Sequence, residues 1–151
     1  MKTKLYLAYG SNMDLEQMDW RCPDANLRGV SEIPDYRLLF KGSKTGSYAT
    51  IEPKEGSKVP VLVWEISERD ERSLDRYEGY PHFYQKKDID VELKGNTVTA
   101  MAYVMDPSRP LGDPSIRYYD VLDRAYEAFG FEKDILENAL AESAYPIQGS
   151  C

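Results

Sequence analysis

The segment Tyr6-Leu7-Ala8-Tyr9-Gly10-Ser11-Asn12-Met13 organises the chain, because an apolar run ends there in a Gly-Ser-Asn corner. Residues 4–9 are apolar on both faces and bounded by glycine, which predicts a short strand that is buried on both sides and central in its sheet. Gly, Ser and Asn are turn formers, so the chain is expected to turn sharply after this strand. Asp14 and Gln17 have the spacing of a capping box, which predicts a helix over residues 15–20.

The rest of the chain alternates between strand and helix patterns. Strands are expected over residues 36–40, 48–52, 59–66, 83–93 and 97–105. The last two are expected to form a hairpin, and a turn is expected at residues 54–57. Helices are expected over residues 68–77, 115–129 and 132–141. This order predicts an α+β fold with a mainly antiparallel, curled sheet and helices packed around it.

The composition is that of one globular domain. The chain has 151 residues, 42% of them hydrophobic and 30% charged. A chain of this length buries roughly two thirds of the surface that its unfolded form exposes. We therefore expect a single domain over residues 1–145, followed by a C-terminal tail over residues 146–151. A monomer and a homodimer are both compatible with the sequence.

Charge and cysteine content bear on the cellular setting. The formal net charge of −7 argues against a nucleic-acid partner, which normally requires a basic face. Cys22 and Cys151 are the only cysteines, so no disulfide framework is implied. The N-terminus has no signal-peptide pattern, and no run approaches about 18 apolar residues. These features predict a cytoplasmic protein that binds neither nucleic acid nor a membrane.

The corner at residues 10–12 has the chemistry of an anion or carbonyl-oxygen site. A strand that stops at Gly-Ser-Asn and feeds a helix leaves successive backbone N–H groups without partners, and the helix start adds a partial positive charge. Ser11 and Asn12 add side-chain donors at the same place. A tight turn with a polar cap would have the same short pattern, so this alternative stays open.

Glu78 is the candidate for proton transfer. It lies at the expected end of the helix over residues 68–77, where the backbone carbonyl groups disfavour a negative charge. This placement is expected to raise the pKa of its carboxyl group toward the range of a general acid or base. A solvent-exposed glutamate beside the capping Gly79 is the alternative, and the position of Glu78 on the same helix face as Leu74 favours burial.

Other reaction centres lack the residues that they need. His82 is the only histidine, so a Ser-His-Asp triad or a cluster of histidine metal ligands cannot form without it. The chain has neither a calcium-loop spacing of carboxylates nor a phosphate loop. We therefore expect no metal and no cofactor. The chain has 12 tyrosines, most of which are expected to pack in the core while one or two line a pocket.

An ordered series of motifs resembles the gamma-glutamylcyclotransferase-like family, from Leu5 to about Phe131. The series comprises Tyr9-Gly10-Ser11-Asn12, Arg21-Cys22-Pro23, Tyr36-Arg37-Leu38-Leu39-Phe40, Val63-Trp64-Glu65-Ile66, Leu74-Asp75-Arg76-Tyr77-Glu78-Gly79 and Ala102-Tyr103-Val104-Met105. The resemblance implies a small α+β fold with a curled, barrel-like sheet and a cavity at its mouth. It also implies a reaction in which the α-amine of a γ-glutamyl compound attacks its own γ-carbonyl, forming 5-oxoproline and releasing an amine.

The resemblance further implies roles for seven residues. Glu78 is expected to be the catalytic general base and acid, and the substrate-binding residues are expected to be Tyr9, Gly10, Ser11, Asn12, Tyr103 and Tyr118. The only partner implied is a small γ-glutamyl substrate. His82 and Phe83 make the rim of the pocket bulkier than the family pattern, which leaves the leaving group open.

Two other functions stay open at this point. One is a catalytically silent small-molecule binding module that retains the same fold and pocket. The other is a related lyase that acts on a different amine-bearing substrate. The retention of Glu78 favours an active enzyme.

Overall fold

The computed structural model describes residues 2–43 and 46–144, so the predicted tail over residues 146–151 lies outside the described residues. The elements are, in order, β1 (Thr3–Ala8), the 3-10 turn η1 (Ser11–Met13), α1 (Leu15–Arg21), β2 (Asn26–Ser43), β3 (Gly46–Ser67), α2 (Glu68–Glu78), β4 (Tyr84–Leu93), β5 (Asn96–Met105), α3 (Ile116–Phe129) and α4 (Lys133–Ala144). The predicted α+β class is confirmed.

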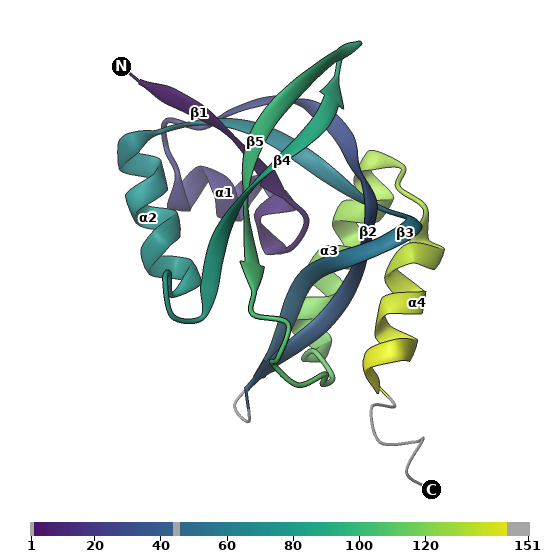
Figure 1. Cartoon of the computed structure of the whole chain (residues 1–151). Helices are drawn as coiled ribbons and strands as arrows, with labels where there is room; N and C mark the ends of the chain where they lie inside the picture. The colour runs from purple at the N-terminus through teal and green to yellow at the C-terminus, as the bar shows by residue number, and fades with distance from the viewer. Residues whose placement is uncertain (1, 44–45, 145–151) are drawn as a thin grey trace, which may run out of the picture.

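The five strands form one mixed sheet in the order β2-β3-β1-β5-β4 (Figure 1). β1 lies in the centre, as its apolar sequence predicts. It pairs antiparallel with β3 along its whole length and parallel with β5 at Tyr6 and Met101. The other neighbours, β2 with β3 and β4 with β5, are antiparallel. The end of β1 therefore opens in the middle of the sheet, where other elements can surround it.

The prediction of two separate strands around residues 54–57 was wrong. β3 is continuous, and its pairing with β2 resumes on both sides of this segment, which bulges opposite Asp35. The Gly56 N–H donates to the Asp35 carboxylate at 3.0 Å, and Gly56 has a φ of +86°, which favours glycine. The turn residues therefore bend one long strand, and this bend contributes to the curl of the sheet.

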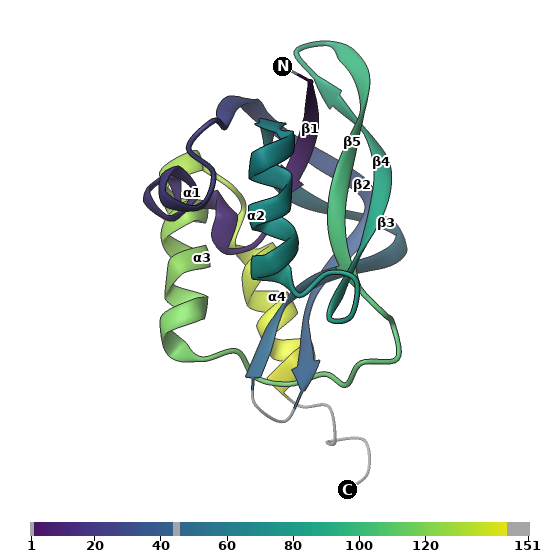
Figure 2. The same ribbon diagram turned by 90° about the vertical axis from the view of Figure 1, so that its left-hand side faces the viewer.

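The sheet is curled so that its two edge strands approach each other (Figures 1 and 2). The Ser31 hydroxyl on β2 donates to the carbonyl of Glu92 on β4. A Cβ at Gly29 would lie 3.1 Å from Leu93 Cδ1, so the close approach favours a glycine there. Within residues 2–43 and 46–144, the ladder of backbone pairs does not continue from β2 to β4. The sheet is thus barrel-like without being closed.

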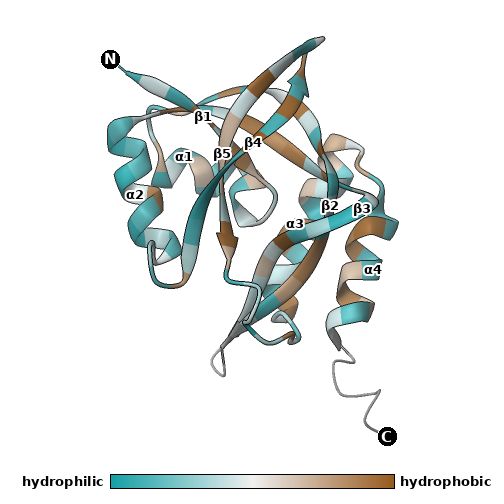
Figure 3. Cartoon of the chain, in the orientation of Figure 1, coloured by the Kyte–Doolittle hydropathy of each residue, from teal (hydrophilic) through white to brown (hydrophobic). Residues whose placement is uncertain are grey.

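The helices cover the curled sheet in two pairs. α1 and α2 lie beside each other, and α3 and α4 lie beside each other, with α4 packed against β2 and α3 against η1 (Figures 1 and 2). Apolar residues concentrate on the strands, whereas α2 is mostly hydrophilic (Figure 3) and buries Leu74 in the core. No helix in the described part of the chain is long and apolar enough to cross a membrane.

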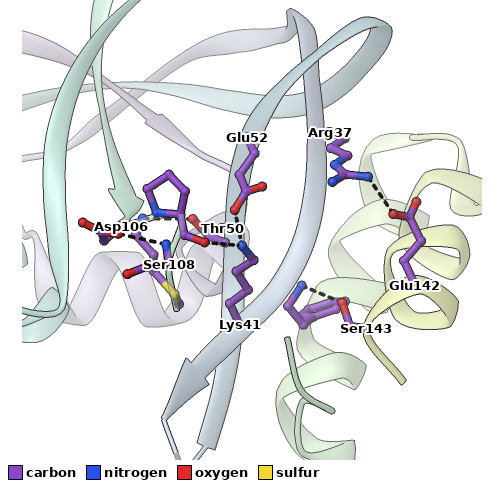
Figure 4. Close-up of polar contacts among 11 residues, drawn as sticks. Arg37, Lys41, Thr50, Glu52, Asp106, Ser108, Glu142 and Ser143 are labelled. Carbon is purple, nitrogen blue, oxygen red and sulfur yellow. Dashed lines mark hydrogen bonds and ion pairs between the residues drawn. The ribbon is translucent and has the colours of Figure 1, made fainter. Parts of the chain in front are cut away.

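Polar contacts hold the segment that leads into α3 and α4 against β2 and β3 (Figure 4). Lys41 is almost buried, forms an ion pair with Glu52 and donates to the carbonyl of Pro107 at 2.8 Å. On α4, the Ser143 hydroxyl accepts from the Phe40 N–H at 2.9 Å. The Lys41–Pro107 bond fastens the segment between β5 and α3 to β2, and the Ser143–Phe40 bond fastens α4 to the same strand.

Both ends of α2 are capped. Ser67 and Asp70 form the predicted capping box at its start. At its end Gly79 adopts a left-handed conformation, with φ of +67°, and its N–H donates to Arg76 O at 3.3 Å. The Tyr80 N–H donates to Asp75 O at 2.9 Å, which completes a Schellman motif. Glu78 is therefore held at the last helical position.

Replacement of Gly79 by alanine is expected to destabilise the protein more than replacement of Gly130. Both glycines end a helix with nearly the same φ, +67° and +69°, so each substitution costs about 1 kcal/mol of backbone strain. Only at Gly79 would the new Cβ lie 3.1 Å from Phe83 Cβ; the space around Gly130 is open. Urea unfolding of Gly79→Ala and Gly130→Ala measures the difference, and equal losses would contradict crowding at residue 79.

Candidate active site

A cavity of about 390 Å³ lies where β1, η1, the end of α2 and the start of α3 meet. Half of its lining residues are aromatic, and few are charged. The lining residues are Tyr6, Leu7, Tyr9, Gly10, Ser11, Asn12, Tyr48, Ala49, Arg76, Tyr77, Glu78, Gly79, Phe83, Tyr84, Tyr103 and Tyr118. These lining residues include every site residue that was predicted from the sequence. Segments up to about a hundred residues apart in the chain therefore meet at one cavity.

The corner after β1 presents backbone donors at one side of the cavity. In η1 the N–H groups of Met13 and Asp14 donate to Gly10 O and Ser11 O, both at 3.0 Å. The preceding N–H groups have no partner within such a turn, and no described side chain caps it. Gly10 is needed for close packing here, because a Cβ would lie 3.0 Å from the Tyr118 hydroxyl. The corner can therefore hold an anion or a polarised carbonyl oxygen.

Asn12 holds the corner in place. Its side-chain N–H donates to the Tyr6 hydroxyl at 2.8 Å, and its side-chain oxygen accepts from Arg21 at 2.5 Å. The Trp64 indole N–H donates to its backbone carbonyl at 3.2 Å. Because each of these groups already has a protein partner, the arrangement assigns Asn12 to the support of the loop. Its amide is less available for a ligand than the sequence suggested.

Glu78 lies at the side of the cavity formed by α2 and is half-buried. Burial raises the pKa of its carboxyl group from 4.5 to about 7, while the positive charge of Arg21 acts in the opposite direction. The sequence predicted a raised pKa from the helix end, and the structure gives burial as the main cause. Glu78 accepts no hydrogen bond from the described residues, so its carboxylate is available to a ligand.

Phenol groups surround this carboxyl group. Burial raises the pKa of Tyr6, Tyr9 and Tyr118, and the nearby charge of Glu78 raises each of them further. The phenols therefore stay protonated at neutral pH. They act as hydrogen-bonding groups of fixed polarity, and Glu78 is the group that can exchange a proton near neutral pH.

Three of the tyrosine hydroxyls donate hydrogen bonds to other groups of the protein. The Tyr9 hydroxyl donates to the backbone carbonyl of Tyr103. The Tyr103 hydroxyl donates to Asp75 Oδ1 at 2.6 Å, and the Tyr84 hydroxyl donates to Ala49 O at 2.6 Å. A hydroxyl whose proton is engaged keeps only its lone pairs for other partners. These three oxygens can therefore accept hydrogen bonds from a ligand.

Two other tyrosine hydroxyls accept hydrogen bonds from the protein instead of donating them. The Tyr6 hydroxyl accepts from the Asn12 side chain at 2.8 Å, and the Tyr118 hydroxyl accepts from the Ala49 N–H at 3.1 Å. Because each oxygen is already an acceptor, its own proton remains available for donation. The cavity thus has hydroxyl donors at Tyr6 and Tyr118.

Sequence reasoning missed several residues at this site. Tyr6 and Tyr84 are two of the 12 tyrosines and received no role, since the residue type alone gives no direction to a hydroxyl. Arg21 was named only within the motif Arg21-Cys22-Pro23 and received no role. Its guanidinium contacts Asn12 and lies 3.6 Å from the centre of the Tyr77 ring. This contact depends on how α1 packs beside η1 and α2, and no sequence signal could have identified it.

Comparisons with known proteins agree on one family. The family model for "Gamma-glutamyl cyclotransferase, AIG2-like" matches residues 6–122. A cattle gamma-glutamylcyclotransferase is 32% identical over 127 residues, which cover 78% of this chain and 67% of that protein. The mouse gamma-glutamylcyclotransferase is 30% identical over 149 residues, which cover 93% of this chain and 79% of that protein.

A solved structure has the same fold. The structure titled "Gamma-glutamyl cyclotransferase" superposes with a TM-score of 0.78 at 28% identity, covering 91% of this chain and 86% of the other. The curled sheet and the helices around it are therefore those of this group of proteins.

The burial of Glu78 has a measurable consequence for stability. A carboxyl group whose pKa is higher in the folded state than in the unfolded state favours folding when protonated, so stability is lost as the pH rises through about 5 to 7. Glu78→Gln mimics the protonated form. We expect it to stabilise the protein by about 3 kcal/mol near pH 8 and by about 1 kcal/mol near pH 5, as measured by urea unfolding.

Glu65→Gln provides the matched control. Hydrogen bonds from Thr3 and Arg28 lower the pKa of Glu65, so this carboxyl group is ionised in the folded state throughout the same pH range. The effect of Glu65→Gln should be nearly the same near pH 5 and pH 8. A pH-independent effect of Glu78→Gln would contradict the raised pKa of Glu78.

Proposed function

The chain belongs to the family of gamma-glutamyl cyclotransferases of the AIG2-like type, and we propose that it converts a small γ-glutamyl compound into 5-oxoproline and a free amine. The match over residues 6–122 supports this general activity. The observation that carries the mechanism is Glu78, a carboxyl group with a pKa of about 7. It lines the same cavity as the backbone donors of the corner.

The proposed reaction is intramolecular. The α-amine nitrogen of the glutamyl group attacks the γ-carbonyl carbon, a new C–N bond closes the five-membered lactam, and the C–N bond to the leaving amine breaks. Two protons leave the attacking nitrogen, which ends as the lactam N–H, and both pass to the leaving nitrogen, which departs as an ammonium group. The atoms balance without water, a metal or a cofactor. Because both reactive groups belong to one molecule, holding the substrate in a bent conformation is the largest catalytic task.

Glu78 would carry these protons one at a time. In its ionised form it accepts a proton from the ammonium group, which frees the amine to attack, and it passes this proton to the leaving nitrogen. The second proton leaves the attacking nitrogen after the new C–N bond has formed and follows the same route. A pKa of about 7 suits both steps, because the group then changes its charge with little free-energy cost at neutral pH. Its lack of a protein hydrogen bond within the described residues supports this role, since both carboxyl oxygens stay available to the substrate.

The remaining groups would bind and stabilise charge. The N–H groups of the corner, which have no partner among the described residues, and the donor hydroxyls of Tyr6 and Tyr118 suit the negative oxygen that forms during attack, and one such donor contributes typically about 3 kcal/mol. The acceptor oxygens of Tyr9, Tyr84 and Tyr103 suit the ammonium group of the substrate. Two sets of opposite polarity would thus orient the two ends of the glutamyl group.

Glu78→Gln is expected to lower kcat by at least about a hundredfold, because the amide cannot accept the proton. The release of 5-oxoproline from a panel of γ-glutamyl amino acids, γ-glutamyl amines and glutathione measures this effect.

In the wild type, kcat/KM should rise with pH through a midpoint near 7, the pKa of Glu78, since the ionised form is the base.

Control measurements distinguish an active cyclotransferase from a protein that only binds the substrate. Glu65→Gln should retain full turnover, and isothermal titration should show that Glu78→Gln still binds the substrates. Wild-type protein that binds members of the panel but releases no 5-oxoproline would refute the proposed reaction and favour a silent binding module.

Tyr6→Phe is expected to lower kcat by roughly a hundredfold, because it removes one hydroxyl donor to the developing negative oxygen. The midpoint of the pH profile should change little, since Glu78 is retained. Tyr36→Phe, on β2 outside the cavity, is the control. Parallel unfolding experiments show whether the loss of the Asn12 partner destabilises the loop. An unchanged kcat would exclude Tyr6 as a donor.

A further inference from the structure

Three aromatic rings connect the two reactive sides of the cavity. The Tyr118 hydroxyl lies beside Gly10, and Phe83 packs against Gly79, the residue after Glu78. Tyr48 lies between the other two rings, with its ring centre 5.3 Å from that of Tyr118 and 6.1 Å from that of Phe83. All three side chains line the cavity. We call Tyr48, Phe83 and Tyr118 the aromatic wall.

The aromatic wall lies where the leaving group must go. In the proposed reaction the γ-carbonyl oxygen lies at the corner, and Glu78 must reach the leaving nitrogen. The substituent on that nitrogen therefore projects between the corner and the end of α2, which is the gap that the wall spans. Tyr48, with 42% of its surface exposed, is its most exposed member, so the wall leads from the reacting atoms to solvent.

The side of the cavity next to α1 is less suited to the leaving group. The Tyr77 ring lies 3.6 Å from the Arg21 guanidinium carbon, and the Tyr77 and Ser11 hydroxyls are 3.2 Å apart. Arg21 is bonded in turn to Asn12. These contacts form a partition between the cavity and the neighbouring hollow beside Trp20, which Tyr77 also lines.

A positive charge beside the wall disfavours a cationic leaving group. The three wall side chains are uncharged, and the Arg109 guanidinium carbon lies 4.2 Å from the centre of the Phe83 ring. Arg109 also donates to the His82 carbonyl at 3.3 Å, which holds it there. A second cation would meet this positive charge, and the Phe83 ring already has a cationic partner. An apolar group meets no such penalty and gains contact with the rings.

Resting on the proposed cyclotransferase reaction, we propose that the aromatic wall is the leaving-group subsite and that it selects γ-glutamyl compounds whose leaving amine bears an aromatic or bulky apolar side chain. Tyr48 is the residue that determines this preference. The subsite binds by ring contact, so a small side chain leaves it empty and a positively charged one is disfavoured.

The test compares three γ-glutamyl dipeptides that differ only in the leaving amino acid. The kcat/KM for 5-oxoproline release should be at least about tenfold higher for γ-glutamyl-phenylalanine than for γ-glutamyl-glycine. For γ-glutamyl-lysine, linked through the lysine α-amine, it should be no higher than for glycine. If 5-oxoproline forms but phenylalanine has no advantage over glycine, the subsite is refuted while the reaction stands. If no dipeptide yields 5-oxoproline, the reaction itself fails, and the subsite with it.

Variants locate the preference in the wall. Tyr48→Ala should reduce the phenylalanine-to-glycine ratio to within about threefold of 1, because the central ring contact is lost. Tyr48→Phe should retain the wild-type ratio, since the ring is kept. Tyr36→Ala, a tyrosine outside the cavity, should also retain it. A ratio that is unchanged in Tyr48→Ala, or lost equally in Tyr36→Ala, would overturn the role of Tyr48.

Discussion

The burial of one carboxyl group is the constraint on which the rest of the site depends. Glu78 is held at the last turn of α2 by the left-handed conformation of Gly79 and by the Schellman bonds around it. Removal of a carboxylate from water raises its pKa, here to about 7. The ionised state of Glu78 is therefore less favourable in the folded protein, and in the proposed mechanism the same shift lets this group exchange protons near neutral pH, a common compromise between stability and activity.

The fold gives this group its surroundings. β1 lies in the centre of the sheet, so the corner at its end is surrounded by α1, α2 and α3, and its N–H groups line a cavity inside the fold. The tyrosines around it have defined polarity, because each hydroxyl is paired with a particular backbone or side-chain group. A site made of neutral phenols, backbone groups and one titratable acid suits a reaction whose main difficulty is bending a single molecule.

Much of the fold could be predicted from local patterns. The strand at residues 4–9, the helix that begins after Ser67 and the hairpin across Lys94-Gly95-Asn96 all appear near their expected bounds, because their hydrophobic period and their capping or turn residues point to the same structure. The segment at residues 54–57 misled the prediction, since its composition is that of a turn. Because β3 pairs with β2 on both sides of this segment, the segment forms a bulge within one strand. Pairing between distant parts of the chain cannot be recognised from the residues of the segment itself.

The sequence by itself determined which residues could do chemistry. It pointed to a Gly-Ser-Asn corner after a buried strand, to a glutamate beside a helix-ending glycine, and to a set of tyrosines, because these depend on residue type and on neighbours within a few positions. Only the tertiary structure decided that Arg21 supports the corner, that Asn12 is engaged by the protein, and which phenols donate and which accept. Those properties arise from contacts between segments far apart in the chain, and the direction of a hydroxyl proton depends on a partner that no local pattern specifies.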